Sequence, residues 1–330
     1  MVLHRRDDDG ARADADPLTL DRPPSSGVWP RLPLAEWRAT CDTLHMWTQI
    51  VGKTALALAP MANHWWQTTL HVTPRGLATP ALPDDGRAVA AEFDFLDHRL
   101  RLRTSDGDER TLPLVPQSVA DFYGAYTEAL AALGLAVRIR PVPVEVVTAI
   151  PFAEDRTHAA YDADAAGRWW RILLQCDRVL RRFGGRFQGK QSPVHFFWGS
   201  FDLAATRFSG RPAPRHSGGA PNCPDYVMVE AYSHECSSVG FWPGSDALAE
   251  PTFYAYAYPE PASYAEAAAL PAEARYDTSL REFTLPYDAV RRAADPDEAL
   301  LAFCQSTYDA AADRGGWDRA GLDRHREAWP

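Results

Sequence analysis

Hydrophobic residues recur along the chain with two spacings, one typical of helices and one typical of strands. A spacing of three to four residues predicts amphipathic helices. Four segments have it: LAEWRATCDTLHMWTQIVG (34–52), SVADFYGAYTEALAALG (118–134), RWWRILLQCDRVLRRF (168–183) and DPDEALLAFCQSTYDAAA (295–312). Alternating or continuous apolar runs between these segments predict strands. The strands are expected near 54–59, 64–73, 88–103, 109–115, 193–208, 226–240, 252–258 and 281–287.

The order of these segments repeats once along the chain. HWWQTTLH (64–71) aligns with HFFWGSFD (195–202), DFLDH (94–98) with EAYSH (230–234), and TLPL (111–114) with TLPY (284–287). Lys53 and Lys190 close VGK and QGK at matching places. The sequence therefore predicts two copies of an αββββα unit.

Two such copies predict an α+β fold built by internal duplication. We expect antiparallel sheets covered by helices, with a pseudo-twofold axis between the copies, and a closed β-barrel with helical lids is the alternative. The boundaries follow from the pattern. They are a disordered acidic tail (1–27), repeat one (28–140), a connector (141–167), repeat two with the expected site (168–315) and a C-terminal tail (316–330).

Composition narrows the class of protein. The 330 residues carry a formal charge of −10 and no basic stripe, which argues against nucleic-acid binding. No apolar run is long enough to cross a membrane, and the charged start does not resemble a secretory signal. Five cysteines without a C-x-x-C pair fit a reducing compartment. We therefore expect a soluble cytoplasmic protein, and the high arginine content indicates a GC-rich genome.

Strand alternation brings carboxylates and histidines onto shared faces. In EFDFLDHRLRLR, Asp94 and His98 fall on the side of the leucines, and in EAYSHEC, Glu230 and His234 share a face. Polar groups on an apolar face need a partner. Each pair can be a hydrogen-bonded couple in the core, a metal-free acid–base group or part of a metal site.

A metal site would draw on the second copy. His195, Glu230 and His234, with Asp202 or His216 as a fourth ligand, could hold Zn²⁺ for hydrolysis or iron for oxygen chemistry. His195 and Asp202 are seven residues apart, so they share a face only if Gly199 forms a bulge.

Cations beside this group suggest an anionic substrate. Lys190, just before the expected strand at 193–208, and Arg207, near the end of that strand, are predicted to orient the substrate next to a catalytic His195. Among the 34 Lys and Arg residues, only Lys53 and Lys190 are lysines. Whether Lys53, with the first copy's His64, Asp94 and His98, forms a second working site stays open.

Several long blocks resemble a known family. TLHMWTQIVGK, NHWWQTTLHVTPRGL, GKQSPVHFFWGSFDLAATRFSGR, EAYSHECSSVGFWPG and YAYPEP are similar to the blocks of a large bacterial family described only as a domain of unknown function. The resemblance covers nearly all of residues 28 to 320. It implies no activity, cofactor or catalytic residue.

The sequence thus leads to two functional hypotheses. The first is a metal-dependent enzyme, a hydrolase or an oxidoreductase, that acts on a small anionic molecule. The second is a non-catalytic small-molecule binding or sensing protein whose carboxylate–histidine pairs are structural.

Overall fold

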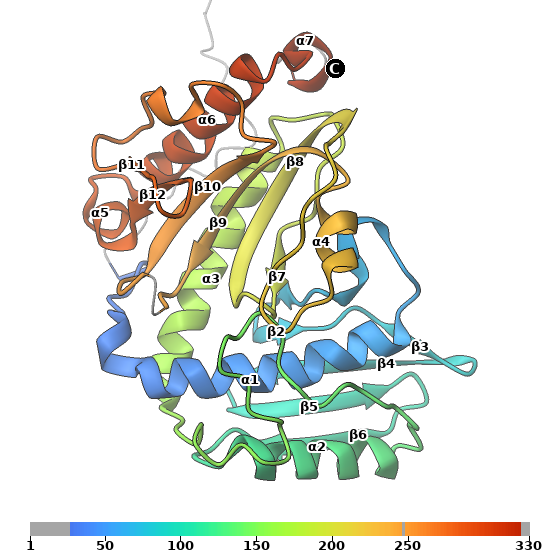
Figure 1. Ribbon diagram of the computed structural model, residues 1–330. Coiled ribbons are helices and arrows are strands. Elements are labelled where there is room, and N and C mark those ends of the chain that lie inside the picture. Colours follow the sequence, from blue (N-terminus) through green and yellow to red (C-terminus); the bar gives the residue numbers. More distant parts are fainter. Residues whose placement is uncertain (1–26, 246–247, 325–330) are drawn as a thin grey trace, which may run out of the picture.

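Two antiparallel sheets and their covering helices form the fold of the computed structural model (Figure 1). The structure describes residues 27–245 and 248–324. The expectation of a disordered tail at 1–27 therefore lies, apart from Gly27, outside the described residues. Within those residues, no helix is both long enough and apolar enough to cross a membrane.

Sheet B belongs to the N-terminal half. Its strands are β1 (His71–Val72), β2 (Gly76–Ala78), β3 (Leu82–Asp84), β4 (Arg87–Asp94), β5 (Arg99–Thr104) and β6 (Glu109–Pro113). Their order is β1-β2-β4-β5-β6, and β3 also pairs with β4. Sheet B is therefore mainly a meander, in which strands that follow one another in sequence lie side by side.

Sheet A belongs to the C-terminal half. It contains β7 (His195–Phe197), β8 (Asp202–Pro212), β9 (His234–Trp242), β10 (Thr252–Tyr258), β11 (Arg275–Asp277) and β12 (Glu282–Pro286). Their order is β11-β12-β10-β9-β8-β7. One bridge joins the two sheets, because the backbone groups of Leu70 and Phe196 hydrogen-bond in both directions at 3.0 and 2.8 Å.

Four long helices cover the sheets: α1 (Leu34–Leu58), α2 (Val119–Ala132), α3 (Ala163–Gly184) and α6 (Pro296–Arg314). The short elements are η1 (Asn63–Thr68), α4 (Asp225–Ala231), η2 (Tyr264–Glu266), α5 (Tyr287–Arg292) and α7 (Arg319–Leu322). Ser118, Asp162 and Asp295 accept hydrogen bonds from the first backbone N–H groups of α2, α3 and α6. Such side-chain caps fix where those three helices begin.

Aromatic residues fill the interior between helices and sheets. Trp47 of α1 stacks on Phe122 of α2 with ring centroids 4.6 Å apart, and Trp169 of α3 stacks on Phe201 at 4.9 Å. Tyr126 of α2 also donates a hydrogen bond to Thr54 of α1. These contacts fix α1 against α2, and α3 against the turn between β7 and β8.

The strand register gives sheet A two different faces. The inner face, packed against α3 and α6, is mostly apolar, and its polar members include Arg207 and the cross-strand partner Ser237. The outer face is polar and aromatic, and its members are His195, Asp202, Thr206, Phe208, Ser238, Tyr254, Tyr256, Tyr258 and Glu282. A solvent-facing sheet surface would carry such residues exposed, but His195, Asp202 and Tyr254 are buried. The outer face is therefore a candidate site.

The helices predicted from the sequence are confirmed, and several of the predicted strands are wrong. Residues expected as a strand at 54–59 continue α1, and those at 64–73 form η1 and β1. The strand at 193–208 is a hairpin of β7 and β8, and the segment 226–240 holds both α4 and β9. Glu230 thus lies on a helix and not on the strand of His234.

The α+β class is confirmed, and the barrel alternative is wrong because both sheets in the described residues are open. Each half runs helix, sheet, helix. This shared order does not by itself confirm the duplication, which stays a hypothesis.

Candidate functional site

Part of the outer face of sheet A is covered by two short helices from different halves of the chain. η1 and α4 lie against one another, and the Trp65 indole donates a hydrogen bond to the carbonyl oxygen of Val227 at 2.9 Å. His64 and Trp65 have left-handed backbone conformations, with φ of 57° and 64°. Such conformations cost non-glycine residues energy and persist where neighbouring contacts hold them.

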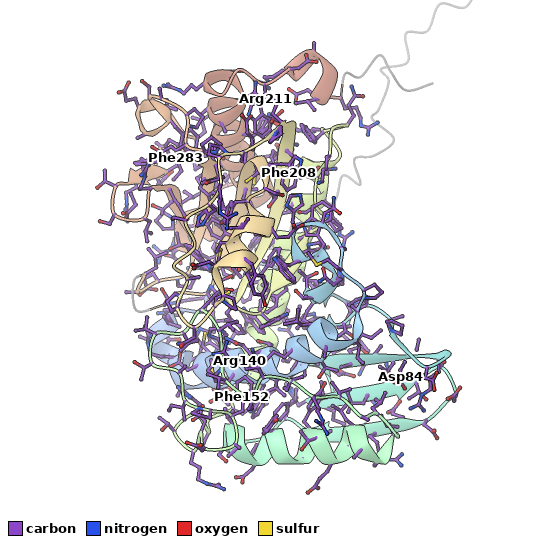
Figure 2. All side chains as sticks on the ribbon, turned by 45° about the vertical axis from the view of Figure 1, so that its right-hand side comes forward. Asp84, Arg140, Phe152, Phe208, Arg211 and Phe283 are labelled. Atoms are coloured by element: carbon purple, nitrogen blue, oxygen red, sulfur yellow. The ribbon has the colours of Figure 1, made fainter. Side chains whose placement is uncertain are left out.

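A lysine–histidine cluster lies where η1 and α4 meet β8. It consists of His64, Trp66, Lys190, Phe208, Glu230 and His234. The Lys190 Nζ and His64 Nε2 atoms are 2.8 Å apart. The Lys190 ammonium also lies 5.5 Å from the Trp66 ring centroid and 5.1 Å from that of Phe208, which is labelled in Figure 2. Lys190 is therefore held between one imidazole and two aromatic faces.

The hydrogen bonds of His64 select one tautomer. Its Nδ1 atom lies 3.0 Å from the carbonyl oxygen of Ala231 and 3.2 Å from that of Glu230. Carbonyl oxygens only accept, so Nδ1 carries the proton and Nε2 accepts from the Lys190 ammonium. The Glu230 carboxylate accepts from the backbone N–H of His64 at 3.1 Å. His234 completes the cluster, with its ring centroid 5.8 Å from that of His64.

Burial makes both members of the pair less basic. Desolvation lowers the pKa of Lys190, against the attraction of Glu230. Desolvation and the Lys190 charge lower the pKa of His64. His64 is 5% exposed, whereas Lys190, Glu230 and His234 are only partly buried. The cluster therefore combines a protected imidazole with an amine that solvent and small molecules can reach.

A tyrosine–carboxylate cluster occupies another part of the outer face. It consists of Glu145, Asp202, Tyr232, Tyr254, Tyr256 and Glu282. Asp202 accepts hydrogen bonds from the hydroxyl groups of Ser200 and Tyr254. The hydroxyl groups of Tyr232 and Tyr256 are 2.9 Å apart. One Glu282 oxygen is buried without a partner among the described residues.

The three carboxyl groups of this cluster hold their protons unusually strongly. Burial raises the pKa of Asp202 to about 6, and burial together with the Asp202 charge raises that of Glu145 to about 7 and that of Glu282 to about 8. Groups with such values can exchange protons near neutral pH.

His195 lies on the outer face but outside both clusters. It is 1% exposed, and its ring lies 5.3 Å from His71, 5.7 Å from Phe197 and 6.1 Å from Trp66. Burial, together with His71, lowers the pKa of His195 to about 3, so the ring is neutral. His195 and Asp202 share a face because residues 198–201 form a hairpin turn, not because Gly199 forms a bulge.

Arg207 lies on the inner face, away from Lys190. Its guanidinium carbon is 3.4 Å from the Phe183 ring centroid, 4.3 Å from that of Tyr308 and 4.9 Å from that of Phe187. It donates a hydrogen bond to the Phe183 carbonyl oxygen. The structure thus makes Arg207 a core residue between sheet A and two helices.

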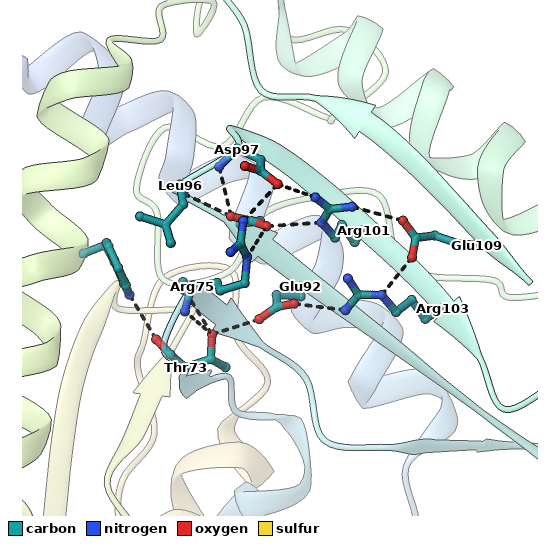
Figure 3. Close-up of polar contacts among 11 residues, drawn as sticks. Thr73, Arg75, Glu92, Leu96, Asp97, Arg101, Arg103 and Glu109 are labelled. Carbon is teal, nitrogen blue, oxygen red and sulfur yellow. Dashed lines mark hydrogen bonds and ion pairs between the residues drawn. The ribbon is translucent and has the colours of Figure 1, made fainter. Parts of the chain in front are cut away.

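Asp94 and His98 do not face one another on a strand, which corrects the sequence interpretation. Asp94 accepts hydrogen bonds from the backbone N–H groups of Leu96 and Asp97, so a turn begins there. It also pairs with Arg75 and Arg101, at 2.7 and 3.2 Å, in the charged network of Figure 3. These guanidinium and backbone donors hold the pKa of Asp94 down at about 2, against its burial.

His98 instead contacts the connector. Its Nδ1 atom lies 2.8 Å from the Tyr161 hydroxyl group.

The four expected metal ligands do not converge. Glu230 and His234 both lie beside His64, whereas His195 packs against His71 and Asp202 against Tyr254. Across residues 27–245 and 248–324, no group of three or more His, Cys, Asp or Glu side chains is arranged to hold a metal ion. The metal hypothesis therefore gains no support from the geometry and stays a prediction.

The sequence does not predict that the carboxylates of Glu145 and Glu282 belong to the site. Glu145 was assigned to the connector, and Glu282 to a strand without chemistry. A signal existed for the tyrosines, because the alternation in TFYAYAY puts Tyr254, Tyr256 and Tyr258 on one face. No local pattern could show that Glu145 reaches that face.

Comparison with known proteins gives a family and no activity. No curated protein and no solved structure matches the chain. One family model, described as a family of unknown function (DUF5996), matches residues 29–324. That range includes both clusters and both sheets, and the chain therefore belongs to the DUF5996 family of unknown function.

Proposed function

We propose that the protein is an enzyme that binds a small anionic molecule and moves a proton with Lys190 and His64. The observation that carries the proposal is the contact of 2.8 Å between Lys190 Nζ and His64 Nε2, in a partly open setting. An amine in this position attracts an anionic ligand while it is protonated. Its lowered pKa makes loss of that proton easier near neutral pH.

His64 holds the Lys190 amine in place. Its Nδ1–H group is engaged by backbone carbonyl oxygens, so the free electron pair of Nε2 points at Lys190. Once the ammonium has given its proton to solvent, the neutral amine, still hydrogen-bonded to Nε2, can take a proton from the bound molecule. Glu230 and His234 border the same space and can hydrogen-bond to another part of the substrate.

Because the substrate is unidentified, the test begins with a panel of small carboxylates and phosphate esters. Binding is measured by thermal shift, and each ligand that binds is incubated with the protein in D₂O. Exchange of a carbon-bound proton for deuterium, or conversion to a new compound, is followed by NMR. We expect at least one ligand to bind and to exchange or react.

Two variants of Lys190 separate binding from proton transfer. Lys190→Arg keeps the charge, but its guanidinium does not give up a proton in proteins, so we expect binding without exchange. Lys190→Met removes the charge, and we expect neither binding nor exchange.

Arg171→Met removes an exposed cation of α3 and is the control, expected to keep binding and exchange. Binding that depends on Lys190, without exchange or reaction of any ligand, would favour the alternative of a non-catalytic binding protein. Unchanged exchange in Lys190→Arg would exclude Lys190 as the proton carrier.

A further inference from the structure

Three aromatic rings form a fixed frame beside the amine of Lys190. The rings of His64 and Phe208 stack with centroids 4.4 Å apart, and the Trp66 ring lies 5.3 Å from His64 and 6.0 Å from Phe208. His64 is 5% exposed and Phe208 is 1% exposed. Rings that contact one another in a packed interior have little freedom to move. The frame therefore has one shape, against which the lysine side chain is placed.

Lys190 is held to this frame at both of its ends. Its carbonyl oxygen accepts a hydrogen bond from the backbone N–H of Phe208 at 3.0 Å. Its Nζ atom lies 2.8 Å from His64 Nε2 and within 5.5 Å of the ring centroids of Trp66 and Phe208. Lys190 is nevertheless partly exposed, so a small molecule can reach the amine. A reactive group held in one place loses less entropy when it reacts.

No carboxylate neutralises the charge of Lys190. Across residues 27–245 and 248–324, its amine takes part in no ion pair, and its hydrogen bond goes to an imidazole. Glu230 lies beside His64, but its carboxylate accepts from the backbone N–H of His64 at 3.1 Å. An ammonium between aromatic rings, without a paired carboxylate, loses part of its hydration and is easier to deprotonate. The lowered pKa of Lys190 agrees with this arrangement.

The contact with His64 also orients the neutral amine. An amine nitrogen is tetrahedral, and one of its N–H groups donates to Nε2, which can only accept in this tautomer. The electron pair of the nitrogen occupies another corner and therefore points away from His64. The Trp66 and Phe208 rings do not bind that electron pair. It stays available to a molecule that approaches from solvent, as in a nucleophilic lysine.

We propose that Lys190 forms an imine with the aldehyde or keto group of a small molecule. The nitrogen electron pair forms a bond to the carbonyl carbon, and one electron pair of the C=O bond moves to the oxygen. A proton passes from the nitrogen to this oxygen and gives a carbinolamine. The nitrogen electron pair then expels hydroxide, which takes a proton from solvent and leaves as water. The product is a protonated imine, whose N–H group can donate to Nε2 as the amine did.

This inference rests on the proposed function in one respect, namely that a small molecule binds at Lys190. It adds a chemical class to that molecule, because a nucleophilic amine needs a carbonyl carbon to attack. It does not require that Lys190 removes a proton from carbon. The two proposals can therefore fail separately.

Reduction traps the proposed intermediate. The full-length protein is incubated with pyruvate, an anionic ketone, or with propanal, an uncharged aldehyde, in the presence of sodium cyanoborohydride. This reagent reduces a protonated imine to a stable secondary amine, which peptide mass spectrometry locates. We expect at least one of the two compounds to give an adduct on the peptide of Lys190. An adduct from pyruvate alone would support a carbonyl group on an anionic substrate.

The chain contains its own control, because Lys53 is the only other lysine. Lys53 is 4% exposed, and we expect its peptide to stay unmodified in the folded protein. In urea the frame around Lys190 is lost, and both lysines should then react to the same small extent. Lys190→Arg should lose the adduct. Should that variant fail to fold, the peptide map of the wild type still decides.

Absence of an adduct on Lys190 with both compounds would overturn the proposal, and so would equal modification of Lys190 and Lys53 in the folded protein. No adduct, with deuterium exchange of other ligands intact, would leave the proposed function standing alone. An adduct without exchange of any ligand would leave the imine and overturn the proton transfer.

Discussion

Glu145 lies directly against Gly199, because a Cβ atom on Gly199 would come within 2.2 Å of the Glu145 Oε1 atom. Glu145 also has a left-handed backbone, with φ of 60°, and its N–H group donates to the Pro221 carbonyl oxygen at 2.7 Å. The connector is thus fixed on both sides of this carboxyl group, which cannot easily move away from the hairpin turn.

Gly199→Ala should therefore destabilise the protein. We expect a loss of about 1 to 3 kcal/mol in the free energy of unfolding, typical of an added atom in a packed site. Gly124→Ala is the control, because nothing lies within 4 Å of its Cβ position in the interior of α2. That variant should gain about 0.5 to 1 kcal/mol. Urea unfolding measures both, and equal effects would show that Glu145 does not constrain the turn.

Stability should fall as the pH rises from neutral to about 8. Folding raises the pKa of Asp202 to about 6, of Glu145 to about 7 and of Glu282 to about 8. Between about pH 4 and these raised values, the folded chain holds more protons on the three groups than the unfolded chain does. The free energy of unfolding therefore falls as the pH rises through this range.

Two buried histidines act in the opposite sense, but only at lower pH. Folding lowers the pKa of His45 to about 4 and that of His195 to about 3. These two groups therefore raise the free energy of unfolding as the pH increases from those values to about 6.5. Above that pH, the decline due to Glu145 and Glu282 outweighs the smaller opposite effect of Lys53, whose pKa burial lowers to about 8. Urea unfolding between pH 6.5 and 8 measures it, and a rise over this interval would contradict the raised carboxyl pKa values.

Glu282→Gln should flatten this decline, because glutamine does not titrate. We expect the loss between pH 6.5 and 8 to shrink by about 1 kcal/mol, the equivalent of roughly one pKa unit. Glu273→Gln is the matched control on an exposed residue and should leave the pH dependence unchanged. A decline of the same size in Glu282→Gln would assign the effect to other groups.

Arg207 should matter for stability and not for the chemistry of Lys190. Arg207→Ala leaves a cavity between three aromatic rings, and we expect a loss of about 3 kcal/mol. Arg207→Met fills most of the space and should lose less than about 1.5 kcal/mol. In folded Arg207→Met, the Lys190 side-chain NMR signal should titrate with the same pH midpoint as in the wild type. A displaced Lys190 midpoint would restore Arg207 as a partner of the site.

Metal content should not depend on His234. The neighbouring His64 has both ring nitrogens engaged, by Lys190 and by backbone carbonyl oxygens. We expect the same zinc and iron content, by plasma mass spectrometry of untagged protein, in the wild type and in His234→Ala. Stoichiometric metal that disappears in His234→Ala would revive the metal-dependent hypothesis.

Local sequence could predict the helices and the strands that alternate cleanly. TFYAYAY is a strand because β-branched and aromatic residues follow one another with period two. The prediction that Asp94 and His98 share a strand face is wrong because the Asp94 carboxylate accepts hydrogen bonds from two backbone N–H groups and begins a turn. Alternation of side chains holds only along a continuous strand.

The site was harder to predict because its members meet through tertiary contacts. Lys190 and Glu230 were identified individually, but their link is His64, which a left-handed backbone on η1 turns toward α4. That conformation follows from contacts with a segment more than 150 positions away, which no local periodicity contains. His195 and Asp202 do share a face, but through the turn at 198–201 and not through a bulge, and they have different neighbours on it.

The bridge between Leu70 and Phe196 has a consequence for incomplete chains. It covers one edge of sheet B with an edge strand of sheet A, so neither edge is open there in the complete fold. Uncovered strand edges are templates on which other chains pair. A fragment that ends before His195 has no β7 to cover sheet B, so interrupted synthesis or proteolysis of the connector would yield an aggregation-prone product.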